Sequence, residues 1–565
     1  MSGVLDLVQG QALIKCQSQN DLLILVWRAV SRALRPSMCL SKFCRQSPVI
    51  SNVQPSSTSR SRHASIASCF RASTFSHNST GHRIMTTPPP DWPEFTGPEL
   101  CRLQAHELVA LLKKGEVSPR DCLDAAFARI EAVEPAINAM PTTCPERAYA
   151  AADNLDGDAT HPGWLAGLPL GIKDLNPVAG VRTTFGTRAF AAFVPDKSDP
   201  LVARIEARGG IIAGKTNTPE MGAGANTFNA VFGATLNPWD TVLNPGGSSG
   251  GAAAGLATGE VWLSHGSDHG GSLRTPAAYC GIVGMRPSPG RAASASPAGF
   301  MTEGTQGPMA RSVRDCALFL DCMAGHTTSI PISFPGPEGG SFQDAVIAAT
   351  PKIRVGFSAD FNGMAQVDAE VLDHLKMVLG LVEGAGSTVE EACPDLSNLE
   401  RTYFTLRGMD MAITARNMPD EVKRHFKQTL IDNMAFGRSM SVDDVADAHL
   451  NRTVIFNKMI EFFASHDVLA CPVVGCMPHP QSEEWVTVVG GKKLTGYMDW
   501  LRFAFLATTA GLPSISVPVG PGPRGLPIGI QLIGKPRGEA ALLAAAQVFE
   551  TATGGPKMPI DPIAA

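Results

Sequence analysis

The sequence predicts an α/β fold in which helices cover both faces of a mixed, twisted β-sheet. Short apolar segments of strand length alternate with longer segments whose apolar residues recur at helical spacing, and this alternation is typical of a sheet packed between helices. The 565 residues include 56 Gly and 43 Pro, which indicates many turns. A hydrophobic content of 44% with 18% charged residues is that of an ordinary globular protein.

The first 90 residues do not resemble part of a compact fold. Residues 1–85 carry ten Lys/Arg against two Asp/Glu, and residues 51–83 are rich in Ser and Arg. A basic, acid-poor start is typical of an organelle transit peptide. The alternative is a disordered or untranslated extension, with Met85 as the working start. We therefore assign residues 1–90 to a targeting or disordered extension, and we expect a cytoplasmic protein, or a mitochondrial one if this extension is a transit peptide.

The globular part is predicted to begin with two helices. Residues 99–114 have apolar residues at helical spacing and are followed by Gly115. Ser118 and Pro119 suit the N-cap and first position of a second helix, which is predicted to run to about residue 131. The later elements are predicted as a strand over 167–172, a helix over 201–208, a strand over 210–213, helices over 371–381, 418–434 and 442–463, and strands over 514–517 and 528–532.

Charge and cysteine usage exclude several classes of function. Beyond residue 85 the chain carries 37 Lys/Arg against 50 Asp/Glu. This acidic body argues against nucleic acid as a partner, because phosphate binding needs clustered Lys and Arg. The apolar run at residues 22–27 is far shorter than the ~20 residues of a spanning helix, so no stable membrane span is predicted. The nine cysteines beyond residue 85 lack metal-ligand spacing, which predicts reduced core thiols and no metal site.

Residues 244–276 contain two serine-containing glycine turns. The first places Ser248 in the run Gly-Gly-Ser-Ser-Gly-Gly, and the second places Ser272 directly after Gly270 and Gly271. Glycines beside a serine let a substrate approach the backbone N–H groups closely. Either turn alone would more simply be a surface turn, but the two together suggest a hydrolytic or acyl-transfer site.

Two motif matches nearby are rejected. Residues 209–216 match the phosphate-binding pattern GxxxxGK[ST], but that loop must follow a strand and open a helix, and here the predicted strand lies inside the pattern. The spacing Gly246-x-Ser248-x-Gly250 matches the nucleophile elbow of α/β-hydrolases. That elbow needs a strand immediately before it, whereas residues 237–245 look like a loop.

A serine nucleophile needs a base, and Lys173 is the candidate. No His stands in a recognisable setting, and Ser-Lys variants of the catalytic triad are known on other folds. A catalytic Lys must be neutral, which requires burial or neighbours that lower its pKa. A pKa shift from ~10.4 to ~7 costs about 4–5 kcal/mol, which is tolerable only in a pre-organised dry pocket. Lys173 directly follows the apolar strand predicted at 167–172 and is placed for such a pocket.

Several motifs in a fixed order resemble the amidase signature family. Similarity runs from about residue 96 to residue 554, and the two serines stand 24 residues apart, as in that family. The motifs are Gly171-Ile172-Lys173-Asp174, Thr183-Thr184-Phe185-Gly186-Thr187, Gly214-Lys215-Thr216-Asn217, Asn237-Pro238-Trp239-Asp240, the stretch 244–276, and the ending from Gly511-Leu512-Pro513 to Gly534. The resemblance implies one large amidase domain over 91–565, although length alone favours two or more domains. It also implies a catalytic core at about 165–320 and a variable region at about 350–500 that shapes the substrate pocket.

The resemblance implies a role for each matching residue. Ser272 would be the acylated nucleophile, Ser248 would relay the proton from a cis peptide position, and Lys173 would be the base. His269 departs from the aliphatic residue or Thr common at its position, so its side chain could touch substrate. The implied oxyanion hole consists of the backbone N–H groups of His269, Gly270, Gly271 and Ser272, and the supporting residues are Ser249, Asp268 and Arg274. No metal or cofactor is needed.

The implied reaction is hydrolysis of a carboxamide to a carboxylic acid and ammonia or an amine. We favour a stand-alone amidase that acts on a small-molecule amide, with a homodimer as a candidate assembly. The family also includes fatty acid amide hydrolases, which usually carry a membrane-spanning start. Another member is the A subunit of glutamyl-tRNA(Gln) amidotransferase, whose glutamine-recognising segment has no evident counterpart in residues 401–425. An inactive scaffold subunit is the alternative from a different class, and the presence of all three catalytic residues argues against it.

Overall fold

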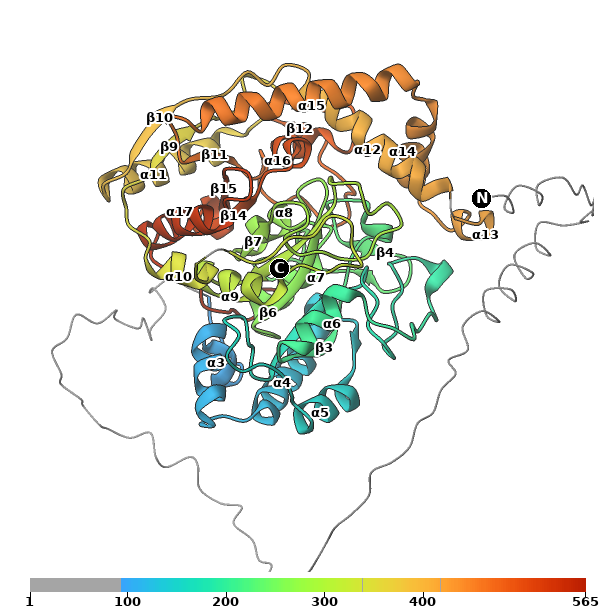
Figure 1. The fold of residues 1–565 in the computed structure, drawn as a ribbon, viewed down its shortest axis with the longest axis vertical. Helices are drawn as coiled ribbons and strands as arrows, with labels where there is room; N and C mark the ends of the chain where they lie inside the picture. Colours follow the sequence, from blue (N-terminus) through green and yellow to red (C-terminus); the bar gives the residue numbers. More distant parts are fainter. Residues whose placement is uncertain (1–92, 338, 417, 565) are drawn as a thin grey trace, which may run out of the picture. The chain divides into compact units, whose positions relative to one another are not determined.

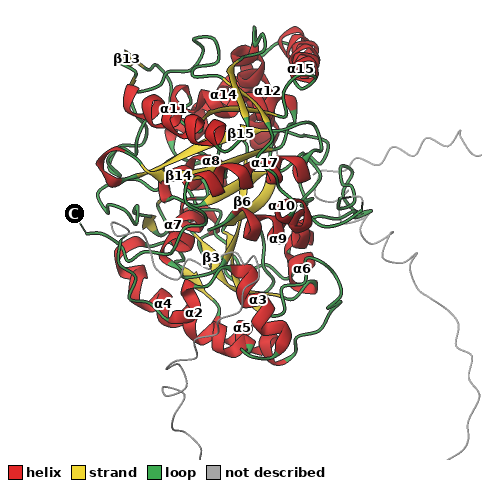
Figure 2. Cartoon of the chain, turned by 90° about the vertical axis from the view of Figure 1, so that its left-hand side faces the viewer, coloured by secondary structure: helices red, strands yellow, loops and turns green. Residues whose placement is uncertain are grey.

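The computed structural model describes residues 93–337, 339–416 and 418–564, so the extension predicted at residues 1–90 lies outside it. The described residues belong to one compact unit built around a large mixed sheet (Figure 1). Helices lie on either side of the strands (Figure 2). The predicted α/β fold is confirmed.

The sheet has eleven strands in the order β1-β3-β2-β6-β8-β7-β14-β15-β11-β9-β10. Strands β3, β2 and β6 run parallel to one another, as do β11, β9 and β10. The pairs from β6 to β11 are antiparallel, so the sheet is mixed. The bounds are β1 Thr142–Thr143, β2 Leu168–Lys173, β3 Gly210–Thr216, β6 Leu263–Asp268, β7 Val283–Arg286, β8 Thr305–Ala310, β9 Arg354–Phe357, β10 Thr388–Glu391, β11 Val468–Pro472, β14 Ser514–Pro521 and β15 Pro527–Ile533. Two small hairpins stand apart, formed by β4 Phe228–Asn229 with β5 Gly233–Ala234 and by β12 Val488–Val489 with β13 Lys492–Lys493.

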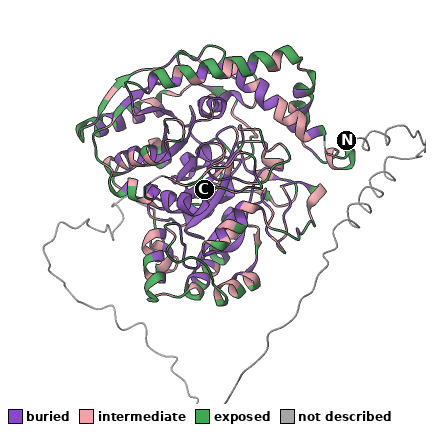
Figure 3. Ribbon diagram, viewed as in Figure 1, coloured by how far each residue is buried: buried purple, intermediate pink, exposed green. Residues whose placement is uncertain are grey.

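The helices form two groups along the chain. The first group is α2 Glu99–Arg102, α3 Ala105–Lys114, α4 Pro119–Ile137, α5 Pro145–Asp153, α6 Pro200–Ala207, α7 Gly250–Thr258, α8 Arg274–Cys280, α9 Val313–Met323 and α10 Phe342–Ile347. The second group is α11 Ala369–Gly384, α12 Leu399–Arg416, α13 Asp420–Lys423, α14 Gln428–Ser439, α15 Val442–Phe462, α16 Phe505–Ala510 and α17 Glu539–Ala552. Short 3-10 helices are η1 Arg188–Phe190, η2 Glu220–Gly222, η3 Asp499–Ala504 and η4 Pro523–Gly525. The central strands of the sheet are buried, whereas the edge strands β1 and β10 are largely accessible and α15 exposes one side to solvent (Figure 3).

Two of the predicted helices are each divided into two. The helix predicted over 99–114 is interrupted because Leu103 and Gln104 are extended, and Gln104 forms a capping box that starts α3. The helix predicted over 418–434 is interrupted because Lys427 is extended and donates its N–H to Glu220 at 2.6 Å. The helix that begins at Pro119 continues to Ile137, six residues further than predicted.

Both motif rejections are confirmed. Lys215 lies on β3 rather than in a loop that opens a helix, so residues 209–216 are not a phosphate-binding loop. The described residues 235–247 contain isolated bridges but no strand, so Ser248 is not on a nucleophile elbow. The nine described cysteines are core residues, as predicted, with the exception of the half-buried Cys393. Within the described residues, no helix has the length and apolar character needed to cross a membrane.

The parallel strands bring the site together at one edge of the sheet. Lys173 is the last residue of β2 and Asp268 the last residue of β6, and parallel neighbours end on the same side. Ligands of open α/β sheets bind beyond these carboxyl ends. Helix α7 starts there too, and it lies so close to β3 that a Cβ atom on Gly251 would stand 2.4 Å from the backbone nitrogen of Asn217. Only glycine permits this approach.

Candidate active site

Lys173 lies at the centre of a cluster of serines. Its side chain is completely buried, and its Nζ stands 2.7 Å from the Oγ of Ser248 and 2.9 Å from that of Ser249. The third neighbour is Ser267, whose Oγ lies 3.1 Å from Nζ and whose carbonyl oxygen lies 3.5 Å from it. The peptide bond between Gly247 and Ser248 is cis, as the resemblance implies. The fold therefore brings Lys173 into contact with Ser248 and Ser249, which lie 75 and 76 residues further along the sequence.

Burial controls the charge of Lys173. Removal from water lowers its pKa to about 7, even though the negative charge of Asp268 acts in the opposite direction. The serine hydroxyl groups supply hydrogen bonds without supplying a negative charge. Lys173 is thus half neutral near pH 7, which is the state in which an amine can accept a proton.

Ser272 lies in the turn between β6 and α8. Its backbone oxygen accepts a hydrogen bond from the N–H of Ser249 at 3.3 Å, which joins the two glycine turns. The N–H groups of His269, Gly270 and Ser272 donate to no acceptor among the residues that the structure describes. The N–H of Gly271, in contrast, donates to Asp268 Oδ1 at 3.1 Å. Of the four predicted oxyanion donors, three are therefore free to bind a ligand in this structure.

Asp268 fixes the shape of this turn. Its buried carboxylate accepts two hydrogen bonds from Arg274, at 2.8 and 3.0 Å, and one from Arg286 at 3.4 Å. It also accepts the N–H of Leu273 at 3.1 Å. Burial would raise the pKa of Asp268, but the charges of Arg274 and Arg286 and the hydrogen bonds hold it well below its usual range. Asp268 is therefore ionised, and Arg274 is its main hydrogen-bonding partner.

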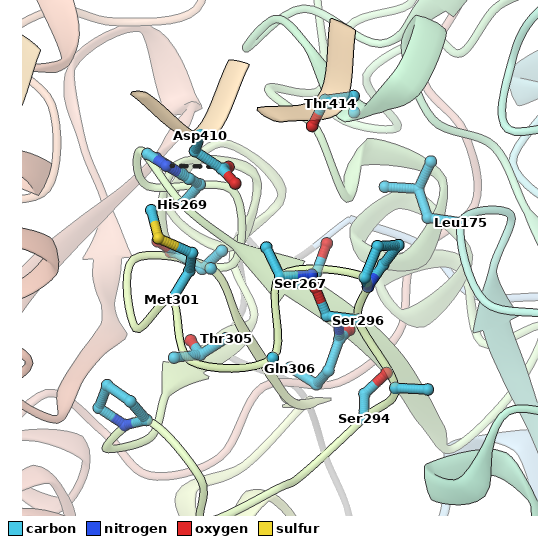
Figure 4. Close-up of a pocket in the computed structure, with 18 of the residues that line it drawn as sticks. Leu175, Ser267, His269, Ser294, Ser296, Met301, Thr305, Gln306, Asp410 and Thr414 are labelled. Carbon is cyan, nitrogen blue, oxygen red and sulfur yellow. Dashed lines mark hydrogen bonds and ion pairs between the residues drawn. The ribbon is translucent and has the colours of Figure 1, made fainter. Parts of the chain in front are cut away.

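A cavity of about 360 Å³ opens over this cluster (Figure 4). Ser248, Ser267 and Ser272 line its floor, next to His269. One wall is the loop of small residues from Pro289 to Gly299 and the other is helix α12, which contributes Arg407, Asp410, Met411 and Thr414. The α12 wall lies within the segment 350–500, which was expected to shape the pocket.

Comparison with known proteins gives the family. Residues 121–543 match the family model described as Amidase, which is about three quarters of the chain. The chain belongs to the amidase family. Like other members, it is a hydrolase that acts on amide C–N bonds.

Relatives cover most of the chain. The A subunit of glutamyl-tRNA(Gln) amidotransferase from Moorella thermoacetica is 33% identical over 488 residues, which is 80% of this chain and 97% of the relative. A solved bacterial aryl acylamidase of the amidase signature family has a TM-score of 0.74 at 27% identity and covers 80% of this chain and 96% of its own. A 6-aminohexanoate cyclic dimer hydrolase has a TM-score of 0.71 at 27% identity, covering 80% and 98%.

Two residues of this amidase site were missed by sequence reasoning. Ser267 contacts Lys173, yet it lies outside both glycine turns and carries no local signal. It could have been found from its place on β6, where it precedes Asp268 at the end of the strand beside Lys173. Asp410 faces the cavity from α12, 138 residues after Ser272, and no spacing rule connects it to the core motifs.

The Asp268 cluster allows a stability prediction. We expect Asp268→Asn to lower the free energy of unfolding by about 3–5 kcal/mol, because the change leaves two buried guanidinium groups without their counter-ion. Urea unfolding followed by circular dichroism measures this loss. The matched control is Asp153→Asn, which breaks an exposed salt bridge to Arg120 and should cost far less. Equal losses in the two variants would contradict the structural role of Asp268.

Proposed function

We propose that this amidase hydrolyses a small-molecule carboxamide through an acyl-enzyme on Ser272. The observation that carries the proposal is the buried Lys173, with a pKa of about 7, hydrogen-bonded to Ser248 at the floor of the cavity that Ser272 also lines. A neutral amine can donate two hydrogens, to Ser249 and Ser267, and accept one proton from Ser248. This arrangement gives Ser272 a base that acts through Ser248.

The reaction then has two halves. In the first, Ser272 Oγ attacks the amide carbonyl carbon while its proton passes to Ser248 and the proton of Ser248 passes to Lys173. The tetrahedral intermediate collapses as Lys173 returns a proton through Ser248 to the leaving nitrogen, so the C–N bond breaks and an ester on Ser272 remains. In the second half, water attacks this ester with the same proton path, and the acid leaves.

The turn from residue 269 to residue 272 supplies the oxyanion hole. The unpaired N–H groups of His269, Gly270 and Ser272 support this role, because they are available where negative charge develops on the substrate oxygen. Removal of one such donor typically costs roughly 10²–10³ in rate. The Gly271 N–H would contribute to the oxyanion hole only if its hydrogen bond to Asp268 were broken.

Trapping with hydroxylamine tests the acyl-enzyme. An ester intermediate partitions between water and a stronger nucleophile, so added hydroxylamine should yield the hydroxamate of the substrate acid. Primary amides with aliphatic, aromatic and long-chain acyl groups would be tried, with ammonia and acid measured together. Hydrolysis that proceeds without hydroxamate would indicate direct attack by water and would contradict the proposal.

A second candidate function is the A subunit of an amidotransferase. The 33% identity to relatives of that name over nearly their whole length favours it. Ammonia release by the purified single chain separates the two candidates, because a stand-alone amidase needs no partner chains. The acidic body and unpaired thiols support a cytoplasmic enzyme, and sedimentation would test the predicted homodimer.

A further inference from the structure

We propose that Asp410 and His269 form a second recognition site in the cavity, which binds a cationic amine of the substrate at a distance from the scissile amide. The inference rests on the proposed function, because it assigns a substrate class to the same cavity. Two side chains of the cavity, His269 and Asp410, make no hydrogen bond to any residue that the structure describes.

His269 presents an unsatisfied imidazole. Only 16% of the side chain is exposed, and neither ring nitrogen has a hydrogen-bond partner among the described residues. Burial, and then the charges of Arg407 and Arg286, lower its pKa to about 3, so the ring is neutral at physiological pH. The ring of Tyr403 packs against it in a T-shaped arrangement, with centroids 6.1 Å apart. A buried donor or acceptor without a partner is costly, which favours a ligand that completes it.

Asp410 presents an uncompensated carboxylate to the same space. Its Oδ2 stands 3.6 Å from His269 Nε2, and Figure 4 shows the two side chains facing each other at the cavity wall. Within the part of the chain that the structure describes, Asp410 pairs with no Lys or Arg and accepts no hydrogen bond. A neutral imidazole cannot balance its charge. A partly buried carboxylate of this kind requires a cation or strong donor, and the cavity is where one can enter.

Arg407 does not neutralise the carboxylate of Asp410. It lies one turn before Asp410 on α12, but it donates to the hydroxyl of Tyr497 at 2.5 Å and to Asn433 Oδ1 at 3.3 Å. These bonds hold its guanidinium against α14 and the loop after β13, and no ion pair to Asp410 forms. The other charged group that influences Asp410 is Glu303, which adds negative charge and is itself paired with Arg452.

The expected ligand is therefore an amide that carries a primary ammonium group. The ammonium would donate to Asp410 and, in the tautomer that has its lone pair on Nε2, to the His269 nitrogen that faces Asp410. Met221, Met301, Met411 and Leu430 line other parts of the cavity and suit an apolar spacer between the two ends. The ammonium can belong to the acyl part or to the amine part of the amide, and substrates of both kinds distinguish these cases.

The test compares matched amides that differ only at the far end. Linear primary amides of several lengths would end in a methyl, an ammonium or a carboxylate, and a second series would carry the ammonium on the leaving amine. We expect the ammonium substrate of the best length to exceed its methyl analogue in kcat/KM by roughly ten- to a hundredfold, as for a charge-assisted hydrogen bond. Asp410→Asn should abolish that ratio. Asp373→Asn, which removes an exposed charge on α11, should keep it.

Binding to the Ser272→Ala variant measures the affinity of the second site in the absence of turnover. Calorimetry should show tighter binding of the ammonium amide than of its methyl analogue, and Asp410→Asn added to Ser272→Ala should remove the difference. Equal affinity for the two amides, or tighter binding of the carboxylate, would overturn the second site. Hydrolysis of the methyl analogue by the wild type would still uphold the proposed function, so the two failures are distinguishable.

The pH dependence of the ratio of kcat/KM for the ammonium and methyl substrates gives a further test, because a merely structural role of Asp410 would not affect it. The groups facing Asp410 are His269, Arg407 and Glu303, and burial with the charge of Glu303 raises the pKa of Asp410 to about 6. The preference for ammonium should therefore rise as pH increases through about 6, where Asp410 loses its proton. Effects of Lys173 cancel in the ratio. A ratio that stays constant from pH 5 to pH 8 would contradict the role of Asp410.

Discussion

Replacement of Ser272 by Ala is expected to lower kcat for amide hydrolysis by about 10⁴-fold or more, since loss of a serine nucleophile leaves only oxyanion binding and proximity. Ser272 is the serine of the turn whose free N–H groups would hold the oxyanion, and it lines the cavity. Initial rates of ammonia release measure the effect. Circular dichroism and the unfolding midpoint should be unchanged, because the Ser272 hydroxyl makes no hydrogen bond to a described residue.

Controls separate this effect from damage to the fold. Ser439→Ala removes a hydroxyl on the exposed end of α14 and should leave the rate unchanged. Near wild-type turnover in Ser272→Ala would show that another group is the nucleophile. Ser248 would then be the next candidate, since it contacts Lys173 directly.

The rate should also depend on pH through Lys173. Its pKa is lowered to about 7 by burial, and only the neutral amine can accept a proton. For a neutral substrate, we therefore expect kcat/KM to be high above pH 7 and to fall tenfold for each pH unit below it. Stopped assays from pH 5 to pH 9 on a neutral amide give the profile.

Lys173→Ala tests the assignment of this titration. The variant should lose roughly 10²–10⁴ in kcat, the usual contribution of a general base, and its residual rate should lack the step near pH 7. A wild-type profile that is flat between pH 5.5 and pH 9 would contradict the role of Lys173. A step that persists in Lys173→Ala would assign it to a different group.

The elements with local signals could be predicted from sequence, and those that depend on packing could not. Ser118 and Pro119 mark the start of α4, and the apolar run before Lys173 marks β2. The division between α13 and α14 depends on a contact between Lys427 and Glu220, which are 207 residues apart. No pattern within the segment indicates that contact.

The same distinction holds in the site. Lys173 and Ser248 belong to motifs that are recognisable in the sequence, and the fold brings Lys173 Nζ within 2.7 Å of Ser248 Oγ. Asp410 lies on α12, in which polar and apolar residues follow no clear helical periodicity. The role of Asp410 depends on how α12 packs over the turn that contains His269. The hydrogen bond from Gly271 to Asp268 could not be predicted either, because it depends on the conformation of that turn.

Mass spectrometry of the acylated protein tests the central claim most directly. An activated ester or anilide of a slowly deacylating acid would be mixed with the protein, and the reaction would be quenched in acid during the burst. The account predicts one acyl group per chain, located on the peptide that contains Ser272 and absent in Ser272→Ala. An acyl group on the peptide that contains Ser248, or turnover with no covalent species at any time, would contradict it.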